Sequence, residues 1–220
     1  MNKSAEGQRK RLKKYMKLEH LKDTLENKRL FLGDPNSWED KNDAKLMELF
    51  KEARGYAAIR VTCLTASADR YHFWDIFGEK ERGVCLWFDR VQLLDDISHD
   101  PNLCAGEVQY YMPESLETKT VDHLPFAKRA QYADEREFRV LRCYQKGEEV
   151  KGALRFRPSS LKGVYLNPWL SQNGGEFDMW KEQIRKWIES AGYGQEIEIL
   201  QNKTIYYPKW IEAAKKIAGR

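Results

Sequence analysis

Residues 132–144 constrain the fold more than any other stretch of this sequence. The run is largely charged up to Phe138 and then turns apolar and β-branched, which is typical of a strand that enters a hydrophobic core. Side chains alternate between the two faces of a strand, so Glu135, Glu137 and Arg139 are expected on the same face. The sequence therefore predicts a polar cluster where this strand begins.

The two carboxylates of this cluster are open to two interpretations. Like charges about 7 Å apart, the spacing of residues i and i+2 on a strand, raise each other's cost of ionisation, and a cation such as Arg139 lowers it. Such an arrangement is found in functional sites. A Glu-x-Glu pair is also found at solvated sheet edges and in ion pairs between strands.

The composition indicates one globular domain. A chain of 220 residues with 41% hydrophobic residues can bury a core of substantial size. Aromatic residues make up 12% of the chain, and their flat faces suit both core packing and contact with nucleobases or a nucleotide cofactor. We expect a single domain over residues 12–220, preceded by a flexible basic arm over residues 1–11.

The net charge of +4 is small, but cations are concentrated near the start of the chain. Five of the six residues from 9 to 14 are lysine or arginine. A basic arm beside aromatic residues can neutralise phosphates and favours nucleic-acid binding that weakens with salt. The same run is also typical of a solvated, frayed terminus.

Cysteine and histidine spacing gives no sign of a metal site or a disulfide framework. The four cysteines are widely separated without a C-x-x-C pair, and the four histidines lack the spacing of metal ligands. No apolar leader and no run of about 18 apolar residues is present, so neither secretion nor a membrane span is expected. These observations favour a cytoplasmic protein of bacterial type that binds no metal.

The periodicity of apolar residues predicts an α+β fold with a mixed, mainly antiparallel sheet flanked by helices. A strand, helix, strand order near the end favours a parallel pair, whereas residues 134–157 are expected to form an antiparallel hairpin. A short helix at 71–77 is expected to be capped by Ser67 or Asp69. Strands are expected at residues 14–16, 30–32, 57–65, 83–88, 105–111, 138–144, 152–157, 163–166 and 196–200, and further helices at 18–25, 46–50, 91–97, 125–130, 177–191 and 208–217.

Several short motifs occur in an order that resembles a known bacterial family. They are Lys14-Tyr15, Leu32-Gly-Asp-Pro-Asn36, Cys63-Leu-Thr65, Phe73-Trp-Asp-Ile-Phe-Gly78, Gly83-Val-Cys-Leu-Trp-Phe88, Val108-Gln-Tyr110 and Glu135-Arg-Glu-Phe-Arg139. Over residues 12–167 the chain resembles the domain-of-unknown-function family numbered 2971. It departs from the family pattern at residues 38–43, which lack an Asn-Asp-Pro sequence, and at Thr65, where serine is usual.

The motif order of this family is similar to that of ADP-ribosyltransferases, which use NAD as a substrate. The resemblance implies that Lys14 or Tyr15 contacts NAD and that Thr65 lies on the strand below the nicotinamide pocket. It also implies that Tyr71 or Trp74 stacks on the nicotinamide ring. Four of these residues also have an interpretation without a function. Trp74 and Tyr15 are typical of a hydrophobic core, Thr65 of a strand end and Lys14 of a solvent-exposed surface.

The resemblance assigns catalysis to the Glu-x-Glu pair. Cleavage of the bond between nicotinamide and ribose develops positive charge on the sugar, which a carboxylate such as Glu137 would stabilise. Glu135 would then orient or deprotonate the acceptor nucleophile. Lys14 or Arg139 would bind the NAD pyrophosphate or set the charge of the carboxylates.

Two functions from different classes follow. The first is a cytoplasmic NAD-dependent ADP-ribosyltransferase, a toxin or phage-defence effector that modifies protein or nucleic acid and has a neutralising protein partner. The second is a non-catalytic module that binds nucleic acid or a partner protein through the basic arm and the aromatic residues. A nuclease has less support, because the sequence shows no acidic or histidine cluster with metal-ligand spacing.

Overall fold

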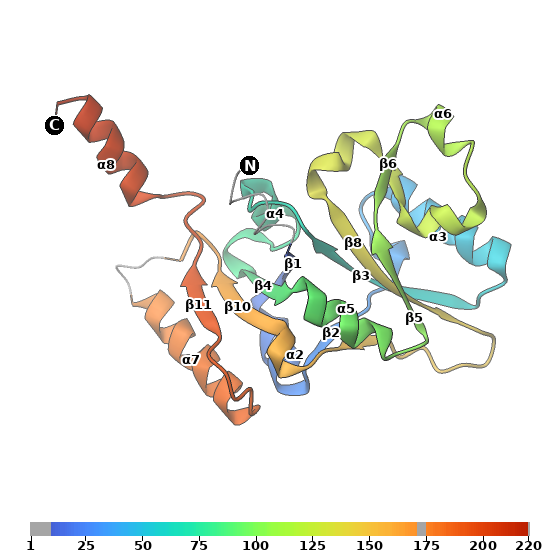
Figure 1. Ribbon diagram of the computed structural model, residues 1–220, viewed down its shortest axis with the longest axis horizontal. Helices are drawn as coiled ribbons and strands as arrows, with labels where there is room; N and C mark the ends of the chain where they lie inside the picture. Colours follow the sequence, from blue (N-terminus) through green and yellow to red (C-terminus); the bar gives the residue numbers. More distant parts are fainter. Residues whose placement is uncertain (1–9, 171–174, 220) are drawn as a thin grey trace.

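A seven-stranded sheet forms the centre of the computed structural model, which describes residues 10–170 and 175–219 (Figure 1). The strand order is β11-β10-β4-β1-β3-β8-β5, and every neighbouring pair is antiparallel except β10 and β11. The predicted α+β class, with its mixed and mainly antiparallel sheet, is therefore confirmed. The strands are β1 (Arg11–Lys17), β3 (Ala58–Thr65), β4 (Gly83–Asp89), β5 (Leu103–Glu107), β8 (Glu137–Tyr144), β10 (Leu161–Leu166) and β11 (Glu198–Gln201).

Two small sheets lie outside the central one. Strand β2 (Arg29–Phe31) pairs with β9 (Ala153–Arg155) in antiparallel fashion, and β6 (Gln109–Tyr111) pairs with β7 (Ala127–Arg129) in parallel. The predicted hairpin over residues 134–157 is therefore wrong, because β8 pairs with β3 and β5 instead of with β9.

Residues 105–111 and 125–130 also differ from expectation. The predicted single strand divides at Val108 into β5 and β6, which belong to different sheets. The helix predicted near 125–130 is wrong, because a 3-10 turn ends at Phe126 and the chain then extends as β7. Pro125 contributes no backbone N–H, which disfavours a regular helix at this point.

Helices cover both faces of the central sheet. Buried residues of α2, α5 and α7 belong to the main core, while α3 and α4 contribute to two smaller apolar clusters. Leu12 lies in the main core and Tyr15 in one of the smaller clusters, as expected for residues on opposite faces of β1. The helices are α2 (Leu21–Asn27), α3 (Lys41–Arg54), α4 (Tyr71–Ile76), α5 (Arg90–Ser98), α6 (Pro113–Leu116), α7 (Glu176–Ser190) and α8 (Pro208–Ile217).

Short 3-10 turns connect several of these elements. They are η1 (Leu18–His20), η2 (Pro35–Ser37), η3 (Lys80–Arg82), η4 (Val121–Phe126), η5 (Ala130–Glu135) and η6 (Pro158–Ser160). In the described ranges, no helix combines the length and the apolar character that a membrane crossing requires.

The central sheet is interrupted between β1 and β3. Strand β1 keeps register with β4 along its whole length, from Arg11 to Lys17, and β3 keeps register with β8 from Ala58 to Thr65. Between β1 and β3 only Lys13 and Thr65 are in register. Two lysines of β1 donate to backbone carbonyl oxygens in and just after β3. Lys14 Nζ lies 3.1 Å from the Cys63 oxygen, and Lys13 Nζ lies 3.1 Å from the Ser67 oxygen.

At the two ends of the described chain lie β1 and α8. Residues 1–9 of the predicted basic arm lie outside the described residues, and β1 begins at Arg11, where the guanidinium lies 4.0 Å from the centre of the Trp87 ring. The final helix α8 is present as predicted and extends away from the central sheet in Figure 1.

Candidate active site

Glu137 begins β8 directly opposite Thr65 of β3. Its side chain is buried, with 6% of the residue exposed, and both carboxylate oxygens accept hydrogen bonds from Arg139. Arg139 Nε lies 2.8 Å from Oε1 and its terminal nitrogen lies 3.0 Å from Oε2. This two-point contact fixes the position and the orientation of the carboxylate.

Arg139 is fully buried and uses its remaining donors on the protein itself. Its terminal nitrogens lie 2.5 Å from the carboxylate of Asp43 on α3 and 3.1 Å from the carbonyl oxygen of Pro125. The Trp38 ring covers the guanidinium, with its centre 5.1 Å away. Arg139 therefore holds two carboxylates inside the protein, and its own side chain has no exposed surface.

Lys128 of β7 joins a third carboxylate to this group. Its ammonium lies 2.6 Å from Glu135, 3.2 Å from Glu137 and 3.8 Å from Asp43. We call Asp43, Lys128, Glu135, Glu137 and Arg139 the carboxylate cluster. Three acids face two bases, so the cluster carries one negative charge when all its members are ionised.

The members of the cluster have different proton affinities. Burial alone would raise the pKa of Glu137, but the charge and hydrogen bonds of Arg139, with the charge of Lys128, outweigh burial and hold the pKa at about 2. Burial raises the pKa of Glu135 and of Asp43 above their ordinary values. Glu137 is therefore an anion at neutral pH, and Glu135 is the better proton acceptor.

The depressed pKa of Glu137 predicts a loss of stability in acid. The folded state binds this proton less readily than the unfolded state, so the stabilisation is complete above the ordinary pKa of 4.5 and is lost as the pH falls toward 2. Between about pH 5 and pH 3 the free energy of unfolding should fall by about 2 kcal/mol through this group. The raised pKa values of Glu135 and Asp43 have the opposite effect, because these two groups increase the free energy of unfolding as the pH falls.

Urea unfolding at several pH values measures this contribution. We expect the free energy of unfolding to decrease more steeply with acid in the wild-type protein than in Glu137→Gln, because glutamine does not titrate. Parallel curves for the two proteins would show that Glu137 has an ordinary pKa.

Glu135 does not lie on the strand as predicted. It ends the turn η5, and Arg136 then adopts a left-handed backbone conformation with φ of 45° before β8 begins. The strand alternation therefore does not set its position. Glu135 still joins Glu137, because Lys128 lies between the two carboxylates and because the Thr65 hydroxyl donates to the Glu135 carbonyl oxygen.

Thr65 and Tyr110 secure the backbone around Glu137. The Thr65 hydroxyl also accepts the backbone N–H of Ser67 at 2.9 Å, so this side chain links the end of β3 to η5. The Tyr110 hydroxyl oxygen accepts the backbone N–H of Glu137 at 2.8 Å. Thr65 thus lies beside the acidic pair, and its hydroxyl is engaged by hydrogen bonds within the protein.

Tyr15 of β1 and Trp74 of α4 pack together. Strand β3, which carries Thr65, lies between β1 and β8 in the central sheet. The rings of Tyr15 and Trp74 meet edge to face with centres 5.1 Å apart, and both donate to Asp69, Trp74 Nε1 at 3.0 Å. Burial raises the pKa of Tyr15. Trp74 has no exposed surface, so it packs in the core, whereas Tyr71 is 51% exposed and lies 5.7 Å from the ring of Trp169.

The predicted cap of α4 is wrong. Arg70 occupies the N-cap position without a side-chain hydrogen bond, and the carboxylate of Asp69 accepts hydrogen bonds from Tyr15 and Trp74 instead. Ser67 uses its carbonyl oxygen to accept from Lys13.

The structure brings some predicted site residues together and separates others. Glu135, Glu137, Arg139 and Thr65 are in direct contact, and Lys14 lies at the interruption of the sheet, where burial lowers the pKa of its ammonium. Tyr15 and Trp74 form a separate aromatic cluster, and Tyr71 lies outside it on the surface.

Sequence reasoning missed Asp43, Lys128 and Tyr110. Asp43 lies in the first turn of α3, where an acidic residue is ordinary, and its burial depends on the distant Arg139. Lys128 belongs to a segment that was expected to be helical. The motif Val108-Gln-Tyr110 in the family resemblance was the one signal that pointed to Tyr110.

The structure has two open cavities that do not include the carboxylate cluster. One is bordered by α3, η2 and the start of β3, and the other by β2, β9 and the far end of β8. Within the described part of the chain, no group of three or more acidic, histidine or cysteine side chains is arranged to hold a metal ion.

Comparison with known proteins gives a distant structural likeness. No family model matches the chain, and no curated protein matches it. Similar solved structures include DarT from Thermus sp. 2.9 in complex with ADP-ribosylated single-stranded DNA (11% identity, TM-score 0.47), with carba-NAD+ (10%, 0.43) and with NAD+ (11%, 0.45). Each match covers 90% of this chain and 97% or 98% of the other. At this identity and TM-score, the likeness assigns no activity and no residue role to this chain.

Proposed function

We propose that this chain is an NAD-dependent ADP-ribosyltransferase in which Glu137 stabilises the transition state. The observation that carries the proposal is the carboxylate of Glu137, held ionised by Arg139 and Lys128 beside Thr65, next to the interruption of the sheet between β1 and β3. A buried anion that is fixed before the reaction suits a developing cation, because it needs no reorganisation when the charge appears.

The proposed reaction needs two carboxylates with different properties. The bond from ribose C1′ to the nicotinamide nitrogen breaks, and nicotinamide leaves with the bonding electrons while the sugar becomes cationic. The Glu137 carboxylate stabilises that charge, and the acceptor nucleophile then bonds to C1′ and gives its proton to Glu135. The raised pKa of Glu135 makes it the stronger base of the pair.

Two exposed side chains at the start of α4 would contact NAD in this proposal. Tyr71 offers an exposed ring for stacking, and Arg70 is an exposed cation within 3.4 Å of the Ser67 hydroxyl that suits the pyrophosphate. Arg139, Tyr15 and Trp74 make no contact with NAD in this proposal. Arg139 fixes the carboxylates, and Tyr15 and Trp74 fix the aromatic packing. NAD reaches Glu137 in this scheme only when η5 moves, because Glu137 is buried and the Glu135 carbonyl is bonded to Thr65.

The acceptor in this proposal is a nucleic acid or a protein. A role as a toxin or phage-defence effector in the cytoplasm, with a neutralising protein partner, remains a prediction from the resemblance. The alternative of a non-catalytic binding module predicts that no NAD is consumed.

Transfer of a label from NAD tests the proposal. The protein is incubated with adenylate-labelled NAD and with single-stranded DNA, RNA or a protein mixture, beside Glu137→Ala. We expect label in one acceptor with the wild-type protein and none with the variant. Equal labelling or equal NAD hydrolysis by both proteins would count against a role of Glu137, and the absence of both activities favours the binding module.

A further inference from the structure

A cavity of about 620 Å³ lies at the opposite end of β8 from Glu137. Its walls come from β2, β9 and the chain before β9, from the first residues of β3 and β5, and from the end of α5. Arg142 lines it from β8, five residues beyond Glu137 and therefore about 17 Å along the strand. The cavity is distinct from the carboxylate cluster.

Cationic side chains outnumber carboxylates in the lining of this cavity. It contains five cationic side chains against two carboxylates, namely Arg29, Arg60, Arg142, Lys151 and Arg155 against Asp96 and Asp100. Asp96 is already bonded to Arg157, outside the lining, at 2.5 Å. Arg29, Arg60 and Lys151 are paired with carboxylates outside the lining, so the unbalanced positive charge of this concave surface comes from Arg155, and such a charge attracts anions.

Two of the arginines face each other on the β2–β9 ribbon. Arg29 is in register with Arg155, and like charges directly opposite on a sheet repel. Arg29 is balanced by Asp23 at 2.8 Å, whereas Arg155 makes no ion pair with any residue that the structure describes. An anion bound between the two arginines would remove the repulsion.

The existing ion pairs of the cavity leave its cations available. Arg60 lies 2.9 Å from Asp34, Arg142 lies 3.8 Å from Asp100, and Lys151 is paired with Glu149. All six side chains are exposed to solvent at least in part, and ion pairs of this kind contribute little free energy. A phosphate can therefore replace these carboxylates.

Phe31 adds an exposed aromatic ring to the same cavity. It is 74% exposed, and its register partner on β9 is the small Ala153. An aromatic ring beside a row of cations suits a single-stranded nucleic acid, in which each nucleotide supplies both a phosphate and an unpaired base. A small anion would use the cations alone.

We propose that this cavity binds single-stranded nucleic acid, with backbone phosphates on Arg29, Arg155 and Arg142 and a base stacked on Phe31. The site does not depend on the chemistry proposed for Glu137, and its test involves no NAD.

Fluorescence anisotropy with a labelled oligothymidylate of about 12 nucleotides measures binding to the full chain. Phe31→Ala is expected to weaken binding about fivefold or more, since it removes a base stack. Arg155→Gln is expected to weaken binding and to reduce the slope of log affinity against log salt by about 1. Both side chains are exposed, so neither change disturbs the core.

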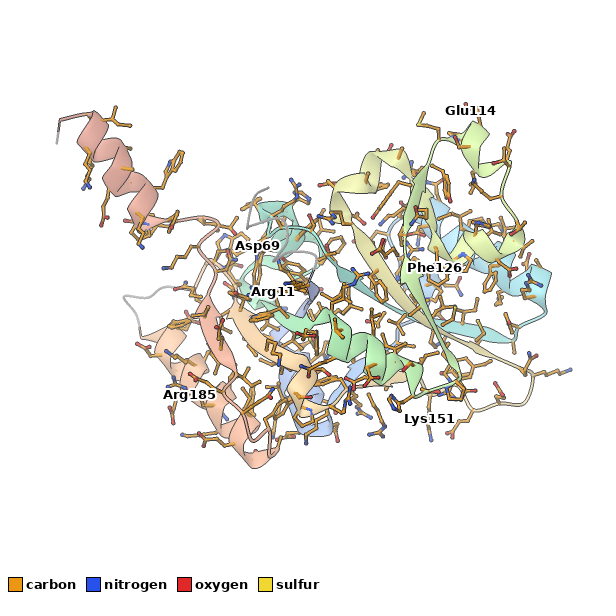
Figure 2. The ribbon with its side chains drawn as sticks, in the orientation of Figure 1. Arg11, Asp69, Glu114, Phe126, Lys151 and Arg185 are labelled. Carbon is orange, nitrogen blue, oxygen red and sulfur yellow. The ribbon has the colours of Figure 1, made fainter. Side chains whose placement is uncertain are left out.

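Arg185→Gln is the matched control for net charge. Arg185 lies on α7, far from Lys151 and the cavity, and is exposed like Arg155 (Figure 2). We expect this variant to bind as the wild-type protein does, and we expect a duplex of the same length to bind more weakly than the single strand. Equal weakening by Arg155→Gln and Arg185→Gln would contradict the site, as would unchanged binding by Phe31→Ala. Displacement of the oligonucleotide by inorganic phosphate more readily than by chloride at equal ionic strength would assign the cavity to a small anion instead.

Discussion

Replacing Glu137 with glutamine is expected to lower the rate of nicotinamide release from NAD by about 100- to 1,000-fold. The amide keeps the shape of the side chain but carries no charge, so it cannot stabilise a cationic ribose. Because Glu137 is fixed by Arg139 and Lys128 before NAD binds, the loss should fall on kcat more than on KM. Steady-state release of nicotinamide, followed by chromatography, measures both constants.

Asp43→Asn is the matched control for this experiment. It removes the same charge from the same cluster and turns the 2.5 Å ion pair of Arg139 with Asp43 into a hydrogen bond to a neutral amide, and Asp43 has no role in the proposed reaction. We expect Asp43→Asn to lose stability while it retains most of its turnover. If the two variants lose turnover to the same extent, the effect reflects a disturbed cluster and Glu137 has no separate chemical role.

Replacing Arg139 with glutamine is expected to lower the free energy of unfolding by about 3–5 kcal/mol at neutral pH. The change leaves Glu137 and Asp43 buried without their main cation, and Glu137 loses two hydrogen bonds while Asp43 loses one. Lys128 remains and lies 3.2 Å from Glu137, so part of the negative charge stays balanced. Urea unfolding with a two-state analysis measures the loss.

Arg142→Gln is the control on the same strand. Arg142 lies three residues further along β8, but its side chain is 30% exposed and its ion pair with Asp100 is 3.8 Å long. Its replacement should cost less than about 1 kcal/mol. Similar losses for the two variants would mean that the burial of Arg139 adds nothing to its contribution.

Local patterns predicted most of the fold because they are set by neighbouring residues. The apolar run at Ala58–Thr65 and the parallel pair of β10 and β11 follow from β-propensity and from the order of strand and helix. The hairpin of residues 134–157 failed because strand pairing is decided across the sheet. Both sides of β8 are occupied by β3 and β5, so β9 pairs with β2.

The sequence predicted only part of the candidate site. Strand alternation placed Glu137 and Arg139 together, since both lie on β8. Asp43 and Lys128 come from α3 and β7, and only the folded chain brings these segments to β8. The sequence did not predict the cavity that contains Arg155 for the same reason, because the arginines that line it come from β2, β3, β8 and β9.

A structure of the protein with a non-cleavable NAD analogue tests the role of Glu137 most directly. We expect the ribose next to the nicotinamide to lie within hydrogen-bond reach of the Glu137 carboxylate, about 2.6–3.2 Å, with η5 displaced from Thr65. An analogue bound elsewhere, with Glu137 still enclosed by Arg139 and Lys128 beneath η5, would contradict that role.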